Sequence, residues 1–385
     1  MSFQTRGGMH STAGLENRNI IRSANMLSML VFLVVLSALI IVHELGHFFM
    51  AKKLGVRVEK FSLGFGKCIL RKKRYETEYS LSAIPLGGYV KLAGDNLEEF
   101  TGKTYEYYSK SVFQRALIIF FGPLANYILG FLLFWFIFAA GFPTLTTRVG
   151  GVMPGFGAEE SGIKAGDKVV AIGAQRVQYW EEMQEAIKSR KPGEKVELSL
   201  LRGTQELTIN VLIKGKNISD SSGRMHNIGL LGITPDEDTI ITVRHGPAQS
   251  FLLAGSRVWF LTAMTYQAMT RMVTGRMSLR ESVTGPLGVF FITSKVMHLG
   301  VIPVLFLLAA LSVSLGIFNL LPLPLLDGGH LALLLIEKIR GKALSEKVEK
   351  IITQAGFSLI ITLAVLVTYN DIVRIFGDKI AKLFK

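Results

Sequence analysis

The sequence predicts an α-helical integral membrane protein with four transmembrane helices, a β-stranded loop and one inserted α+β domain. Hydrophobic residues make up 49% of the 385 residues, and the mean hydropathy is +0.39. This composition is too apolar for an ordinary soluble protein and too polar for a chain that lies entirely in a membrane. Long apolar runs toward both ends of the chain, separated by a more polar middle section, account for both values.

The first apolar run predicts a transmembrane helix over residues 26–51, after an N-terminal tail of residues 1–25. Leu27 to Val42 contain no charged residue, and a lysine pair follows the run. At 1.5 Å per residue the run is about 37 Å long, enough to cross a hydrocarbon core of about 30 Å with some tilt. Met26 is an alternative start of the natural protein. The run resembles a signal sequence, which we expect to be retained as an anchor.

A metal-binding pattern, HExxH, lies inside this first span. Histidines four residues apart share one face of a helix, so the imidazoles of His43 and His47 can bind one Zn²⁺. Glu44 is turned about 100° around the helix from His43, which favours a role as general base on a zinc-bound water. Ionisable residues inside a span are costly and usually functional. The pattern therefore predicts a hydrolase whose active site lies within the membrane.

Residues 52–111 are expected to form a loop with strands near 61–66, 78–84 and 87–92. An edge strand close to the zinc could hold a peptide in extended form by β-addition, and the alternative is a small sheet without a catalytic role. The basic residues that follow the first span place this loop in the cytosol by the positive-inside rule. Arg18 and Arg22, before the span, argue mildly for the opposite orientation.

A second span is predicted over residues 112–142, with a polar interruption at Gly122–Asn126. Such interruptions are tolerated in spanning helices when neighbouring helices satisfy the freed backbone groups. Asn126 is therefore expected to face protein. Its side chain serves either in helix packing or in contact with a substrate.

The character changes to that of a soluble domain over residues 145–237, where short strands surround an amphipathic helix near 181–189. The stretch Gly162–Val169 resembles a PDZ domain of the bacterial protease type, with a last strand at 232–235. Residues 238–300 are expected to form a linker with an amphipathic helix on the membrane surface.

The third span, residues 301–336, contains the candidate third ligand of the metal. Two prolines break the helix after Asn319, and Asp327 then lies in an apolar neighbourhood where a carboxylate requires a partner. A catalytic zinc takes three protein ligands and leaves one position for water, so Asp327 would complete the set begun by His43 and His47. His330 is expected to be a packing or capping residue.

The chain ends with a cytosolic loop at residues 337–353, a fourth span at 354–376 and a tail at 377–385. Four spans return both termini to the same side of the membrane as the inserted domain, outside the cytosol. Basic residues are scattered over loops, so the net charge of +14 indicates topology and lipid contact, and no nucleic-acid partner. The single cysteine, Cys68, excludes an intrachain disulfide.

In this order, HELGH, Gly-Pro-x-x-Asn, a PDZ-like insertion and Asn-x-x-Pro-x-Pro-x-Leu-Asp-Gly resemble the site-2 protease family, in particular its bacterial sigma-E regulator branch. The resemblance covers about residues 26–376 and departs from some members in having one PDZ domain rather than two. It implies an intramembrane zinc endopeptidase of the bacterial inner membrane, with the PDZ domain and both termini periplasmic. The implied substrates are single-pass membrane proteins, such as an anti-sigma factor that has already been cut once, and remnant signal peptides.

The resemblance also implies that Phe61–Leu92 is a membrane-associated β-loop whose Gly88, Tyr89 and Val90 hold the substrate strand. Asn126 and Asn319 could orient the peptide or stabilise charge. Two other functions remain as alternatives. A non-catalytic PDZ adaptor conflicts with the intact metal pattern, and an ion or solute transporter would use broken helices near Asn126 and Asp327.

Overall fold

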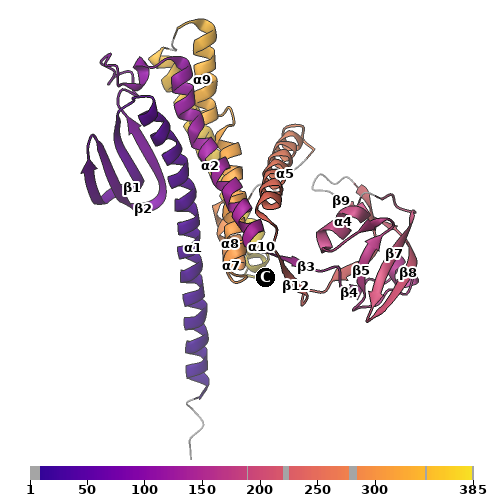
Figure 1. Cartoon of the computed structure of the whole chain (residues 1–385). Coiled ribbons are helices and arrows are strands. Elements are labelled where there is room, and N and C mark those ends of the chain that lie inside the picture. The colour runs from indigo at the N-terminus through magenta and orange to yellow at the C-terminus, as the bar shows by residue number, and fades with distance from the viewer. Residues whose placement is uncertain (1–8, 189, 220–224, 277–283, 343–344, 384–385) are drawn as a thin grey trace, which may run out of the picture. The chain divides into compact units, whose positions relative to one another are not determined.

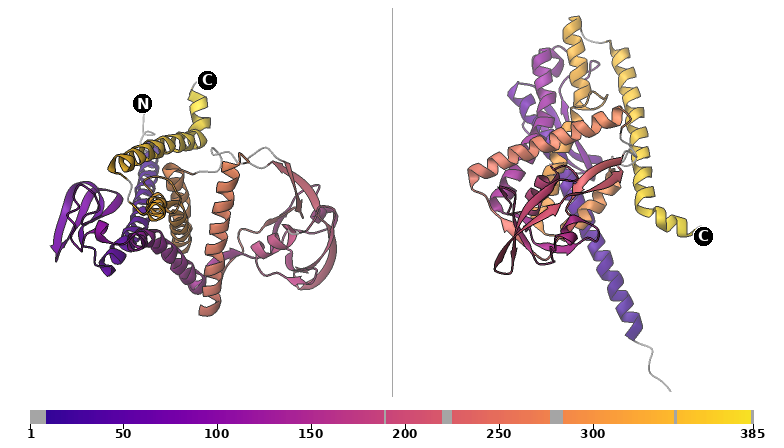
Figure 2. Two further views of the ribbon diagram at one scale, coloured as in Figure 1. Left: turned by 90° about the horizontal axis from the view of Figure 1, so that it is seen from above. Right: turned by 90° about the vertical axis from the view of Figure 1, so that its right-hand side faces the viewer.

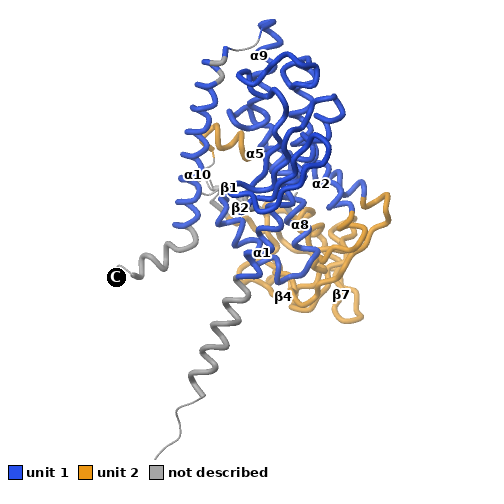
Figure 3. The backbone as a smooth tube through the Cα atoms, turned by 90° about the vertical axis from the view of Figure 1, so that its left-hand side faces the viewer, with its two compact units in different colours: residues 1–135, 251–267, 283–385 blue, residues 136–250, 268–282 orange. Residues whose placement is uncertain are grey.

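The structure is a computed structural model that describes residues 9–188, 190–219, 225–276, 284–342 and 345–383. The chain divides into two compact units, which Figure 3 colours separately. The first unit contains residues 1–135, 251–267 and 283–385, and the second contains residues 136–250 and 268–282. Each unit has its own cluster of buried hydrophobic side chains.

The first unit is built from long helices (Figures 1 and 2). Among the described residues, four stretches of helix are long and apolar enough to cross a membrane, and they overlap the four predicted spans. They lie in α1 (Met9–Lys53), α2 (Val112–Ala140), α8 (Val301–Asn319) and α10 (Glu346–Leu383). Shorter helices complete the unit: α5 (Pro247–Val273), of which residues 251–267 belong here, α7 (Pro286–Met297), α9 (Asp327–Arg340) and the 3₁₀ turn η1 (Tyr107–Ser109).

The helices extend further than the sequence predicted. α1 begins at Met9, inside the segment expected to be a tail, and α10 runs past both ends of the predicted 354–376 span to Leu383. Much of the predicted loop at 337–353 is also helical, because α9 ends only at Gly341, which has a φ of +72° and forms its C-cap. Adding a residue to an existing helix is far easier than nucleating one, so these polar segments continue the helices next to them.

Helix α7 was not predicted, because its 12 residues are too few to span a membrane and its surroundings read as a linker. Its N-terminus is capped by Asp371 of α10, whose carboxylate accepts hydrogen bonds from the backbone N–H groups of Gly285 (3.2 Å) and Gly288 (2.8 Å). The other face of α7 packs on α1, where the rings of Phe32 and Phe290 lie 5.8 Å apart. The cap and this contact join the first and last long helices.

Helix α2 is continuous through its polar segment, and Pro123 lies inside the helix. Helix α8 supports it there, since the hydroxyl of Ser312 donates to the carbonyl of Asn126 at 2.8 Å. The structure therefore lacks, in this described stretch, one of the two broken helices that the transporter alternative requires.

The predicted loop strands form one sheet from two long strands, β1 (Val58–Arg74) and β2 (Thr77–Leu92), beside the C-terminal half of α1 (Figure 1). The first part of β1 pairs twice, so that Phe61 lies opposite both Val90 and Tyr79. The last part of β2, residues 88–92, is consequently an edge. Its Leu92 N–H donates to Asp95 rather than to β1, at 3.0 Å. The edge thus turns backbone groups away from the sheet.

The second unit contains a four-stranded sheet in the order β6–β5–β7–β8 and three two-stranded pairs. The sheet strands are β5 (Lys168–Ile172), β6 (Gln175–Arg176), β7 (Lys195–Arg202) and β8 (Gln205–Leu212). The pairs are β3 (Phe142–Leu145) with β12 (Ile240–Val243), β4 (Val149–Val152) with β11 (Ile233–Pro235), and β9 (Lys214–Ser219) with β10 (Met225–Leu230). The helices are α3 (Gly157–Glu160) and α4 (Trp180–Lys188).

Every second side chain of β7 points into the hydrophobic core of this unit. Val196, Leu198 and Leu200 are buried, and each fully buried side chain of this kind contributes about 1.5–3 kcal/mol to stability. One carboxylate is buried beside them. Arg202 donates to both oxygens of Asp167 at 2.8 Å, and this contact lowers the pKa of Asp167 below its ordinary value.

Candidate metal centre

The two histidines of HExxH lie on one face of α1, as their spacing predicts. The Nε2 atoms of His43 and His47 are 3.2 Å apart. Both rings therefore present a nitrogen to the same point in space, and the approach of a third group decides whether this point can hold a metal ion.

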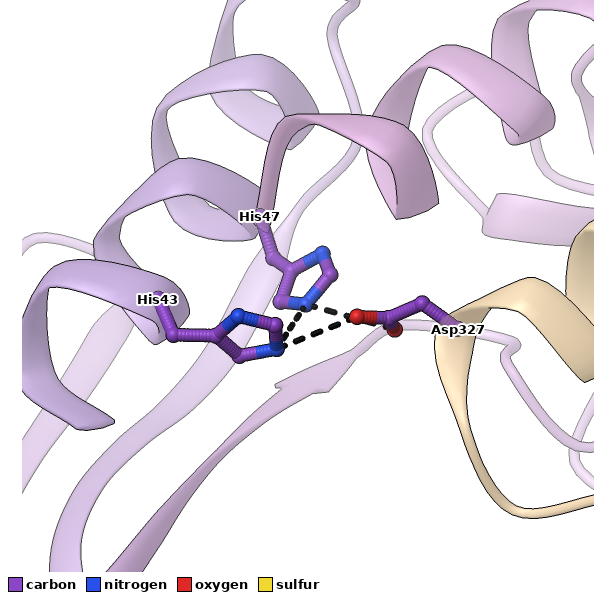
Figure 4. A group of neighbouring side chains, drawn as sticks. All are labelled: His43, His47 and Asp327. Carbon is purple, nitrogen blue, oxygen red and sulfur yellow. Dashed lines mark hydrogen bonds and ion pairs between the residues drawn. The ribbon is translucent and has the colours of Figure 1, made fainter. Parts of the chain in front are cut away.

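Asp327 supplies that third group from the first residue of α9 (Figure 4). Its Oδ2 lies 3.1 Å from His43 Nε2, and its Oδ1 lies 3.5 Å from His47 Nε2. Ligands about 2.1 Å from a tetrahedral zinc ion lie about 3.4 Å from one another. The two histidines approach different oxygens of Asp327, and one ligand atom from each of the three residues lies within 4.8 Å of the other two, so the set can share one zinc ion.

The turn between α8 and α9 brings Asp327 to this place. A Cβ on Gly328 would lie 2.3 Å from the backbone of Leu320, and one on Gly329 would lie 2.2 Å from the carbonyl oxygen of Leu323. Any side chain at either position would clash with the turn. The two glycines after Asp327 therefore allow α9 to fold back closely on the end of α8.

The carboxylate of Asp327 also shows that the donor set fits a cation. Its Oδ2 is buried and accepts no hydrogen bond from the described residues. A buried carboxylate oxygen without a hydrogen bond is costly unless a cation neutralises it. Two imidazoles and one carboxylate are the donors of many catalytic zinc sites, and three protein ligands leave one position open for water.

The other ring nitrogens of the histidines have partners that orient them. His47 Nδ1 donates to the carbonyl of Ile118 at 2.9 Å, which leaves the lone pair of Nε2 free for a metal. His43 Nδ1 faces the amide of Asn126 at 3.2 Å and that of Asn319 at 3.4 Å. The Asn126 Oδ1 lacks a partner among the described residues. Turning this amide by 180° would let Oδ1 accept the Nδ1 hydrogen that metal-bound His43 must carry.

Two glycines let α1 and α2 approach closely enough for these contacts. A Cβ on Gly46 would lie 2.1 Å from the carbonyl oxygen of Phe121. A Cβ on Gly122 would lie 2.2 Å from Nε2 of His47, the atom that faces the metal. Only glycine leaves room for the ligand at this crossing.

Glu44 lies on the side of α1 that faces the edge of the sheet. Its carboxylate accepts a hydrogen bond from the backbone N–H of Val90, and a Cβ on Gly88 would lie 3.5 Å from its Cγ. A cavity of about 340 Å³ adjoins these groups. Its lining includes Glu44, His47, Val90, Asp327 and His330.

The structure brings together most of the residues that the sequence singled out: His43, Glu44, His47, Gly88, Val90, Asn126, Asn319 and Asp327. Tyr89 is different, because its ring stacks 6.3 Å from that of Phe65 on the sheet and does not line the cavity. Asn126 is fully buried, which favours orientation of His43 over the predicted contact with substrate. His330 lines the cavity next to the metal ligands, a place that its expected packing role did not suggest.

Four further residues line the far part of the cavity and were not predicted: Tyr107, Tyr108, Arg115 and Glu337. Burial raises the pKa of Tyr107 above its ordinary value. In the sequence, the one sign of this part of the cavity was Arg115, a charged residue within the first turn of an apolar helix.

A His, His, Asp set that suits zinc, held by helices apolar enough to span a membrane, defines a membrane-embedded zinc metallopeptidase. Residues 31–363 match peptidase family M50, and the chain belongs to this family, the site-2 proteases. The chain is accordingly a zinc metallopeptidase, and its metal is zinc.

The chain is similar to several curated proteins and to a solved PDZ domain. The chain is 28% identical to Protease RseP of Yersinia pestis over 90% of this chain and 99% of that relative. It is 33% identical to a putative zinc metalloprotease of Campylobacter jejuni, over 89% of this chain and 93% of that one. The regulator of sigma-E protease RseP of Escherichia coli is 29% identical, over 89% and 98%. Among solved structures, the PDZ domain of an SdrC-like protein from Listeria monocytogenes is 24% identical over 24% of this chain and 87% of its own, with a TM-score of 0.20.

Proposed function

We propose that this protein cuts single-pass membrane proteins within or beside their membrane segment, with His43, His47 and Asp327 as zinc ligands and Glu44 as the catalytic base. The observation that supports this most strongly is the joint position of these residues. Two ligands and the base lie in an apolar helix long enough to span, and the third ligand follows another such helix directly.

The residues suggest a role for each group in peptide hydrolysis. Zinc, when bound, lowers the pKa of a water molecule and polarises the scissile carbonyl. Glu44 accepts the proton of the attacking water and delivers it to the leaving amine. A peptide strand added beside residues 88–92 would compete for the Val90 and Leu92 N–H groups, which β1 does not use and which the carboxylates of Glu44 and Asp95 accept in the structure. Extended binding matters because a helix hides its scissile carbonyls in hydrogen bonds. Asn319, which is half-buried beside His43, orients the bound peptide.

The relatives extend the proposal to substrates and orientation. Several of them carry the name regulator of sigma-E protease, so an anti-sigma factor after a first cut is the proposed type of substrate, with remnant signal peptides as a second type. By the positive-inside rule, the basic residues after α1 favour a β-loop in the cytosol of a bacterial cell. The α+β domain is then a periplasmic PDZ domain that limits the size of the substrate ectodomain.

The test is to map the cut in a single-pass substrate reconstituted with the full-length protein in lipid vesicles. We expect mass spectrometry of the fragments to place the cut inside or within a few residues of the apolar segment, and a zinc chelator to prevent it. Chelator-sensitive cleavage only in the soluble ectodomain would contradict the proposed function while leaving the peptidase activity intact.

A further inference from the structure

An ion pair that the metal site does not use lies in the lining of the cavity. Arg115 in the first turn of α2 contacts Glu337 near the end of α9, with 2.5 Å between the guanidinium nitrogen and the carboxylate oxygen. The side chain of Arg115 is 6% exposed, and that of Glu337 is 17% exposed. The guanidinium also lies over the rings of Tyr107 and Tyr108, 5.9 and 5.3 Å from their centroids.

Glu337 lies on the same helix as a metal ligand. Asp327, His330, Leu334 and Glu337 are spaced by three and four residues, so they form one face of α9, and all four line the cavity. Asp327 and Glu337 are about 15 Å apart along the helix axis. Polar contacts therefore hold this face of α9 at both of its ends, through the histidines at one end and through Arg115 at the other.

Arg115 is in turn connected to the other ligands through α2. It lies one helical turn before Ile118, whose carbonyl accepts the Nδ1 hydrogen of His47. Three contacts thus close a ring: α1 to α2 at His47 and Ile118, α2 to α9 at Arg115 and Glu337, and α9 to α1 at Asp327 and the histidines.

We propose that Arg115 and Glu337 are positioning residues for the metal site, because their ion pair fixes the angle of α9 that carries Asp327 to the two histidines. A helix is stiff over this length, so a shift of the Glu337 end tilts the Asp327 end. A few tenths of an ångström matter at the metal, where ligand distances hold within about 0.2 Å. Removal of either partner also leaves a buried charge unpaired, which drives the helix ends apart toward water. This inference rests on the proposed ligand set.

The experiment compares Arg115→Ala and Glu337→Ala with the reversed pair Arg115→Glu/Glu337→Arg, in the full-length protein in detergent. Metal binding is measured directly, by zinc retention against a competing chelator and by the visible absorption spectrum of the Co²⁺-substituted protein. The control is Glu76→Ala, which removes a pair of similar length, Glu76 with Lys52 at 2.6 Å, that is exposed at the end of α1.

We expect each single variant to weaken zinc binding by about 10- to 100-fold, the range for groups that orient ligands, and to change the Co²⁺ spectrum. With a reconstituted substrate, kcat should fall while KM stays close to the wild-type value, because the proposed peptide-binding edge at residues 88–92 is unchanged. The reversed pair should recover most of the zinc affinity and the wild-type spectrum, and Glu76→Ala should resemble the wild type.

Wild-type zinc affinity and spectrum in both single variants would overturn the inference. If the single variants do not fold, Arg115→Lys, which keeps the charge, and the reversed pair decide. The inference would also be overturned if the reversed-pair protein folds but binds zinc no better than Arg115→Ala or Glu337→Ala. The zinc-retention and Co²⁺ measurements need no substrate, so failure of the proposed proteolysis would be seen separately, as wild-type protein that binds zinc and cuts no membrane segment.

Discussion

Glu44→Gln is expected to abolish proteolysis while the protein keeps its zinc. Glutamine has almost the same shape but cannot accept a proton from water, and general base catalysis contributes about 10²- to 10⁴-fold to a rate. Glu44 is not among the three residues whose ligand atoms converge, so the metal should remain. The measurement is kcat/KM on a reconstituted single-pass substrate, together with the zinc content of the purified variant.

Glu59→Gln is a matched control, because Glu59 is a carboxylate of β1 that pairs with Lys91 outside the cavity. It should cleave as the wild type does. Unimpaired cleavage by Glu44→Gln would refute the assignment of the base. Loss of zinc from Glu44→Gln would instead make Glu44 a ligand, contrary to the geometry described above.

Gly122→Ala is expected to remove zinc from the protein and cleavage with it. The new methyl group would lie 2.2 Å from His47 Nε2 and 2.3 Å from its Cε1, so the ring or the helix must move. The ring is held by the hydrogen bond from Nδ1 to Ile118, and the helices are held in contact at Gly46. We expect the zinc content to fall well below one per chain and kcat/KM to fall at least about 100-fold.

Gly130→Ala provides the control for crowding in the same helix. A Cβ at Gly130 would meet the side chain of Val313 at 2.6 Å and the carbonyl oxygen of Ala309 at 3.0 Å, away from the metal. This variant should lose stability, typically by about 1–3 kcal/mol for an overpacked core position, and should still bind zinc. If Gly122→Ala bound zinc as tightly as the wild type, the close crossing at His47 would not exist.

The three residues that converge as the candidate metal site could be singled out from the sequence because metal chemistry restricts the choice. Two histidines at helical spacing require a third ligand, and Asp327 is an acid in an apolar stretch where a free carboxylate would be unstable. The apolar runs likewise predicted the long helices, because length and hydropathy alone decide whether a helix can span.

Other features depend on what a residue faces, which the sequence does not state. Gly122 was predicted only as part of a polar interruption that a spanning helix tolerates, whereas its lack of a side chain makes room for His47 from another helix. Arg115 and Glu337 were not singled out, because nothing in their spacing shows that residues so far apart in the chain meet. Residues 88–92 became an edge only through the double pairing of β1, a register that three short strand patterns could not reveal.

The central claim is that HExxH in α1 and Asp327 at the start of α9 hold one zinc ion, and zinc analysis of the Asp327→Ala variant tests it most directly. We predict one zinc per wild-type chain, with X-ray absorption showing two imidazole nitrogens and a carboxylate oxygen at about 2.0–2.2 Å. The Asp327→Ala variant should lose most of this zinc while its helix content is unchanged. A full complement of zinc in Asp327→Ala, with the same absorption spectrum as the wild type, would contradict the account.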